Sequence, residues 1–144
     1  GIKEKKGSLD GYKEIATVEG GGATDVTFKA VSDALQAHDN INVIYCINDT
    51  SAAGAIQAVK EAGLTGKVAV VGKDAAPIGK HAISEGKQSQ SSGQRPTYMG
   101  YTAVQYASKL IKGEKVEFNT AVKAYNVDTS NIKDFDLDAW DTLK

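Results

Sequence analysis

Residues 41–47 (INVIYCI) and 67–72 (KVAVVG) are two short apolar runs, and together they decide the fold class. Runs of this length and β-branched content are typical of strands that helices cover on both faces of a sheet. Between them, residues 50–62 place apolar side chains on one helical stripe, and Gly63 ends that helix. A strand, a helix and a second strand with short connections indicate a parallel sheet.

The rest of the chain continues this alternation of strands and helices. We predict a strand at 14–19, helices at 24–37, 77–84 and 97–112, and an edge strand at 120–127. The fold class that follows is α/β: a three-layer α/β/α domain with a mostly parallel, flavodoxin-like sheet. We expect residues 1–144 to form a single lobe whose acidic tail, 128–144, is only partly ordered.

The composition excludes several classes of partner. The 144 residues, with 41% hydrophobic and 24% charged side chains, suit one soluble domain. A formal net charge of -1 gives no sign of binding to nucleic acid or to an anionic lipid surface. No apolar stretch reaches the length of a membrane span. The lack of a signal peptide is expected of a cytoplasmic protein or of a mature or trimmed chain.

Motifs for catalysis are missing. No Walker-type phosphate loop occurs, and no dinucleotide fingerprint follows the glycines at 20–22. His38 and His81 lack a second ligand at metal-binding spacing, and Ser51 has no histidine placed to activate it. We interpret the lone Cys46, in its apolar run, as a small buried hydrophobe. We therefore predict a protein that is not an enzyme, with no catalytic residue, no metal and no cofactor.

The loops that follow the two apolar runs are the best candidates for a binding site, because ligands of parallel sheets bind beyond the carboxyl ends of the strands. The segments 47–55 (INDTSAAGA) and 70–77 (VVGKDAAP) resemble the type I periplasmic binding proteins, particularly the ribose-binding group. They also resemble the related effector domains of LacI-type repressors. Further support comes from 82–87 (AISEGK), 94–100 (QRPTYMG) and 110–116 (LIKGEKV), in matching order from about residue 9 to residue 127.

The resemblance implies a receptor in which two α/β lobes, joined by three hinge strands, close around a sugar. It implies that Asn48 and Asp74 are ligand residues of the second lobe and that Gln94 lies at a hinge, facing the cleft. Carboxylates and amides suit this task because they pair with vicinal hydroxyls, which both donate and accept. Two simpler interpretations remain open: Asp74 caps the helix that begins at Pro77, and Asn48 shapes the turn before Asp49.

The chain departs from the family pattern in three ways. The family has a first lobe and an arginine-bearing segment before the matching region, so we expect a truncated lobe with weak or no sugar binding. Lys73 stands where the family usually has an aromatic residue. Residues 88–92 (QSQSS) stand where it usually has an apolar strand. We expect such a strand not to contribute normally to a core. Together, these polar replacements suggest a surface engineered for solubility after a partner lobe was removed.

The segment 95–113 resembles the part of the family that crosses into the other lobe. Without that lobe, its apolar stripe needs another surface. We expect it to fold back onto this domain or to pair with another chain, as in a homodimer through helix 97–112.

The function that follows from the resemblance is a non-catalytic carbohydrate-binding lobe of a periplasmic solute receptor for an ABC transporter. Its partners would be a small sugar, the missing N-terminal lobe and the transporter permease, without nucleic acid, and the parent protein would be periplasmic or extracytoplasmic. Two alternatives stay open: an engineered flavodoxin-like scaffold with no ligand, and the effector domain of a LacI-type regulator. The regulator would need a DNA-binding headpiece, which we do not find in this sequence.

Overall fold

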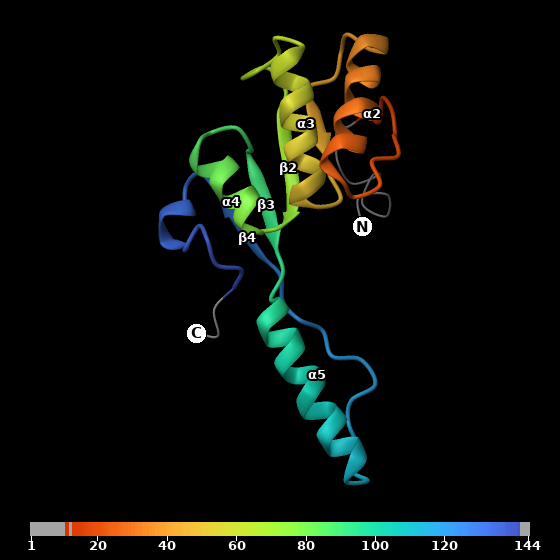
Figure 1. Cartoon of the computed structure of the whole chain (residues 1–144), viewed down its shortest axis with the longest axis vertical. Helices are drawn as coiled ribbons and strands as arrows, with labels where there is room; N and C mark the ends of the chain where they lie inside the picture. Colours follow the sequence, from red (N-terminus) through yellow and green to blue (C-terminus); the bar gives the residue numbers. More distant parts are fainter. Residues whose placement is uncertain (1–10, 12, 142–144) are drawn as a thin grey trace.

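The computed structural model describes residue 11 and residues 13–141 and builds them around one four-stranded sheet (Figure 1). The elements, in chain order, are α2 (Thr24–Ala37), β1 (Val43–Tyr45), α3 (Asp49–Glu61), β2 (Ala69–Asp74), α4 (Pro77–Ser84), β3 (Gln90–Gly93), α5 (Pro96–Ile111), β4 (Tyr125–Asp128) and the 3-10 helix η2 (Ile132–Asp134). The strand order is β1-β2-β3-β4; the first three strands are parallel and β4 is antiparallel to β3. The predicted fold class, an α/β lobe with a mostly parallel sheet, is confirmed.

The main core lies between the sheet and the helices α2 and α3. Its buried members are Val31, Cys46, Ala52, Ala55, Ala58, Val59, Val68 and Val70. The inner side of α3 carries small residues, which let α2 approach closely. A Cβ atom at Gly54 would lie 2.2 Å from the carbonyl oxygen of Thr24, at the start of α2. Glycine is therefore needed where these two helices meet.

A second, smaller core joins α4 to the chain that follows β4. Ala75, Ile83 and Val127 are buried there, and the rings of Tyr125 and Phe135 stack with their centroids 5.7 Å apart. The buried Lys80 donates hydrogen bonds from Nζ to the carbonyl oxygens of Asp136, Ala139 and Trp140. These bonds hold the tail against α4 as far as Trp140; residues 142–144 of the predicted tail lie outside the described residues.

One expected strand is absent and one is covered on a single face. Residues 13–20 run without regular secondary structure and are mostly exposed, so the strand predicted at 14–19 is wrong. Alternation of apolar residues does not suffice for a strand when the segment finds no ladder partner. The prediction that 41–47 is covered on both faces is also wrong, since Val43, Tyr45 and Ile47 are 56%, 54% and 68% exposed.

The polar segment at 88–92 forms part of the sheet interior. β3 pairs with β2 on one side and β4 on the other, and Gln88 and Ser91 are fully buried. The expectation that this segment cannot contribute to a core is therefore wrong. The hypothesis of an engineered surface rested partly on this segment, and two of its side chains, Gln88 and Ser91, are buried and so belong to no surface.

Helix α5 extends away from the sheet in Figure 1, and none of its residues is buried. Its exposed apolar side chains include Met99, Tyr101, Val104, Leu110 and Ile111. Within the described residues, α5 therefore does not fold back onto the lobe. No described helix has the length and apolar character needed to cross a bilayer.

The contact at Gly54 gives a test of the packing of α2 on α3. We expect Gly54→Ala to lower the free energy of unfolding by about 2 kcal/mol, because the added methyl group overlaps the backbone of α2. Urea denaturation followed by circular dichroism would measure the change. Gly100→Ala, in α5, is the matched control because a Cβ there meets nothing within 4 Å. Equal effects of the two substitutions would contradict this account of the packing.

Candidate functional site at the carboxyl ends of the parallel strands

The three residues named from the sequence lie at one edge of the sheet. Asn48 follows β1, Asp74 ends β2 and Gln94 follows β3, and these three strands are parallel. Gln94 donates a hydrogen bond from Nε2 to Oδ1 of Asp74, so the fold brings these two side chains into contact. The carboxyl ends of parallel strands are the usual ligand-binding edge of such sheets.

Asn48 is the N-cap of α3, and it is also hydrogen-bonded to the glycine loop at 20–22. Its Oδ1 accepts from the backbone N–H of Ser51 at 2.7 Å, and its Nδ2 donates to the carbonyl oxygen of Gly22 at 3.2 Å. The interpretation that Asn48 shapes this turn is therefore confirmed. A side-chain amide has two acceptor lone pairs and two donor hydrogens, so one of each remains after these bonds.

Asp74 lies in a strained backbone conformation. Its φ is 109°, and that of Ala75 is 54°, both in the region that non-glycine residues rarely adopt. The capping interpretation is wrong for Asp74, since the N-cap of α4 is Ala76 and no side chain caps that helix. Nζ of Lys73 lies 3.3 Å from Oδ1 of Asp74, the oxygen that also accepts from Gln94. Strain of this kind is often found at functional sites.

A buried carboxylate, Asp49, lies directly behind this edge and is 1% exposed. Its Oδ1 accepts from Ser91 Oγ at 2.7 Å and from Gln88 Nε2 at 2.9 Å, and its Oδ2 accepts from the N–H of Ala76 at 2.8 Å. Burial raises the pKa of the Asp49 carboxyl, and these three hydrogen bonds oppose that shift. The donors thus compensate the carboxylate for the water it has lost.

The hydrogen bonds among Asp49, Gln88 and Ser91, together the Asp49 network, hold the strained turn that carries Asp74. Ser91 Oγ also accepts from the N–H of Ala75 at 2.9 Å, so consecutive amides of the turn, at 75 and 76, are held by Ser91 and Asp49. A Cβ atom at Gly72 would lie 2.2 Å from the Asp49 carboxylate, and one at Gly79 would lie 2.3 Å from it. Sequence reasoning missed this network, although two polar side chains in a strand that is otherwise expected to be apolar were a signal of it.

Cys46 is buried in the core and 5% exposed, as predicted. Burial, with a smaller contribution from the negative charge of Asp49, raises the pKa of its thiol from 9.0 to about 12. A thiol in this state is protonated at neutral pH and is a poor nucleophile.

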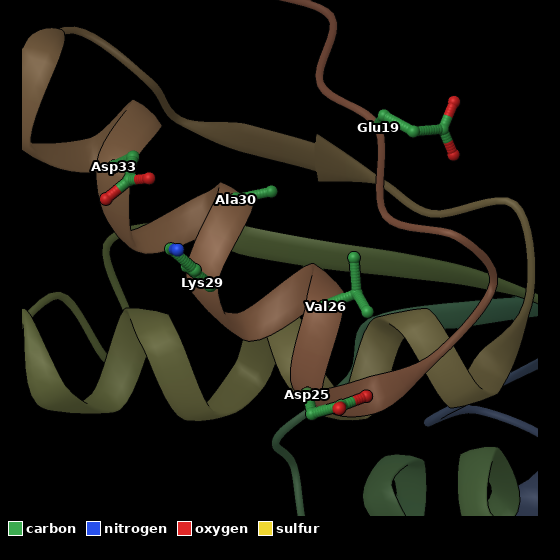
Figure 2. A pocket seen from close by; sticks show the side chains of 6 residues that line it. All are labelled: Glu19, Asp25, Val26, Lys29, Ala30 and Asp33. Carbon is green, nitrogen blue, oxygen red and sulfur yellow. The ribbon is translucent and has the colours of Figure 1, made fainter.

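A hollow of about 370 Å³ lies on the outer side of α2, away from this edge of the sheet (Figure 2). It is lined by Glu19, Asp25, Val26, Lys29, Ala30 and Asp33. Figure 2 shows that the Glu19 carboxylate points away from Lys29 and Asp33, so these charged groups do not converge. None of the three residues named from the sequence lines this hollow. In the described part of the chain, no group of three or more His, Cys, Asp or Glu residues is arranged to hold a metal ion.

The fold is an α/β lobe with polar residues at the carboxyl ends of its parallel strands, the edge at which such lobes commonly bind ligands. Comparison with known proteins shows its family. The chain matches the periplasmic binding protein domain over residues 1–115 and belongs to that family. It is 40% identical over 85 residues to the D-allose-binding periplasmic protein of Escherichia coli, a match covering 59% of this chain and 27% of that protein. It is 37% identical over 87 residues to the ribose import binding protein of the same organism, covering 60% and 29%.

Solved structures of solute-binding proteins have the same fold over most of this chain. A periplasmic solute binding protein of an ABC transporter from Actinobacillus succinogenes, with bound D-allose, superposes with a TM-score of 0.87 at 28% identity. The match covers 92% of this chain and 47% of that one. A solute binding protein from Bacillus halodurans, with bound myo-inositol, gives 0.85 at 26% identity, covering 92% and 46%. The chain therefore spans about half the length of these structures.

The burial of Cys46 leads to a test by alkylation. The thiolate fraction at pH 8 falls roughly a thousandfold when the pKa rises from 9.0 to about 12, and burial adds a steric barrier. We expect iodoacetamide to modify the folded chain at least a hundredfold more slowly than the same chain in guanidinium chloride. Mass spectrometry over time would measure both rates, and similar rates would contradict the buried placement.

The Asp49 network leads to a test of stability. In Asp49→Asn, the new NH₂ group would face the donors that now bind the carboxylate. We expect the free energy of unfolding to fall by about 3 kcal/mol, the cost of unsatisfied buried donors. Asp33→Asn is the control, since Asp33 is exposed on α2. Chemical denaturation of both variants would measure the difference, and a loss below about 1 kcal/mol for Asp49→Asn would show that the network contributes little.

Proposed function

We propose that this chain is a non-catalytic carbohydrate-binding lobe of a periplasmic solute receptor that serves an ABC uptake system. The observation that carries the proposal is the contact of Gln94 with Asp74, on a strained turn at the ligand-binding edge of the sheet. Asn48 lies at the same edge, after the neighbouring strand β1. A carboxylate flanked by amides presents acceptors and donors to the vicinal hydroxyls of a sugar.

The known relatives support a polyol ligand. The names of the curated relatives refer to allose, ribose and xylose, and two of the matching structures hold D-allose and myo-inositol. These ligands share a compact ring with several adjacent hydroxyl groups. We therefore propose a monosaccharide or cyclitol as the ligand class for this chain.

The proposed site is one wall of a cleft. Ordinary pockets bury 70–90% of a ligand's surface, and a single sheet edge covers one side only. We propose that a second lobe supplies the other wall, and that the exposed apolar side of α5 packs against that half of the receptor. In the absence of the second lobe, we expect this chain to form a homodimer through the apolar side of α5. The proposed partners thus include the second lobe and the membrane permease, and the proposed location is the periplasm.

The proposal can be tested by NMR titration of the ¹⁵N-labelled chain. We expect D-allose, D-ribose or myo-inositol to give saturable amide shifts at Asn48, Asp74 and Gln94, at millimolar concentrations because one wall is present. Asp74→Asn removes a charge-assisted bond of about 1.5–3 kcal/mol and should weaken binding roughly tenfold or more. Asp33→Asn, on the outer side of α2, should leave the affinity unchanged. Shifts confined to the hollow on α2, or affinity unaffected by Asp74→Asn, would contradict the proposal.

A further inference from the structure

A hollow of about 260 Å³ lies where the end of the sheet meets the base of α5. Its walls come from β2, the segment from β3 into α5, and residues 120–124 before β4. Three of the residues that line it are cationic, namely Lys73, Arg95 and Lys123, and none carries a carboxylate. The whole chain has a formal net charge of -1, so this gathering of positive charge does not reflect a basic composition.

The hollow is continuous with the candidate sugar site. Gln94 lines the hollow and donates to Asp74. Lys73 also lines it, and its Nζ lies 3.3 Å from Oδ1 of Asp74. A ligand whose hydroxyls reach Asp74 would therefore extend its other groups toward the cations.

Two carboxylates at the margin interact with two of the three cations. Asp74 pairs with Lys73. Asp141 interacts electrostatically with Arg95, while its Oδ1 accepts from the N–H of Thr97 at 3.0 Å. Lys123 is exposed and makes no ion pair within the described part of the chain. Lys123 is thus the cation of this hollow whose charge is free to pair with an anionic group of a ligand.

Arg95 is placed to bind that charge. Its guanidinium carbon lies 5.3 Å from the centroid of the Tyr125 ring, a contact that orients the planar group. Stacking on a ring uses the face of the guanidinium and leaves edge N–H groups for a planar acceptor such as a carboxylate. The neighbouring Lys123 adds a flexible point charge.

We infer that the ligand of this site is an anionic monosaccharide, a uronate or an aldonate, with hydroxyls on Asp74 and Gln94 and its carboxylate on Arg95 and Lys123. This inference rests on the proposed sugar-binding function and narrows it. A neutral sugar would dehydrate these cations without compensation, whereas a carboxylate replaces the lost water with charge-assisted hydrogen bonds. The volume, just below the usual lower limit of about 300 Å³ for ligand pockets, suits a single sugar ring.

The test compares acid and neutral sugars of the same stereochemistry on the chain as it stands. In ¹⁵N NMR titrations at low salt, we expect D-galacturonate to bind at least tenfold more tightly than D-galactose, with shifts at Lys73, Gln94, Arg95 and Lys123. Raising the salt should reduce that ratio, because exposed charges are screened. Galactose 6-phosphate and inorganic sulfate are titrated in parallel to separate a sugar acid from a sugar phosphate or a bare anion.

Charge-removing variants complete the test. We expect Lys123→Gln and Arg95→Gln each to weaken galacturonate binding fivefold or more while leaving galactose binding within twofold. Lys29→Gln, on the outer side of α2, is the matched control and should change neither. Because Lys123 is exposed, its substitution keeps the test valid even if Arg95→Gln disturbs the fold.

Each other outcome has a defined meaning. Equal affinities for galacturonate and galactose would overturn the inference and leave the proposed function standing. Sulfate binding as tightly as galacturonate, or a tenfold preference for galactose 6-phosphate, would also overturn the assignment of a sugar acid. If neither galacturonate nor the neutral sugars, allose and ribose included, bind at the sheet edge, the inference and the proposed function both fail.

Discussion

The rest of the site depends on one buried carboxylate. Asp49 begins α3, and its two oxygens accept hydrogen bonds from Gln88, Ser91 and the N–H of Ala76. These bonds join the start of a helix, the segment of β3 and the turn after β2. A charge removed from water must keep its hydrogen bonds, so the three segments are held at fixed distances from one another. The turn bearing Asp74 derives its geometry from this constraint.

This constraint also explains residues that look out of place. Gln88 and Ser91 are polar within a sheet interior because they supply donors to Asp49. Gly72 and Gly79 lack side chains because any Cβ would overlap the carboxylate. The polar strand is therefore part of the core, and an apolar strand would leave the carboxylate short of partners.

Helices cover only part of the apolar surface of the described lobe. Helices α2 and α3 bury one face of β1, while Val43, Tyr45 and Ile47 stay largely exposed, and α5 extends from the sheet without a buried residue. Apolar surfaces of this kind usually mark contacts. The chain spans about half the length of the solved solute-binding proteins that it matches.

The sequence by itself determined the order of elements, because the periodicity of apolar residues is local: the helices and the two parallel strands flanking α3 lie within a few residues of their predicted bounds. It also placed Asn48 and Asp74 after predicted strands, whereas Gln94 was named from the family resemblance. Only the tertiary structure decided that 14–19 forms no strand. It alone also decided that Gln88 and Ser91, which follow Asp49 in the sequence by 39 and 42 positions, bind its carboxylate. Such partnerships depend on sheet register and helix packing, which no single segment encodes.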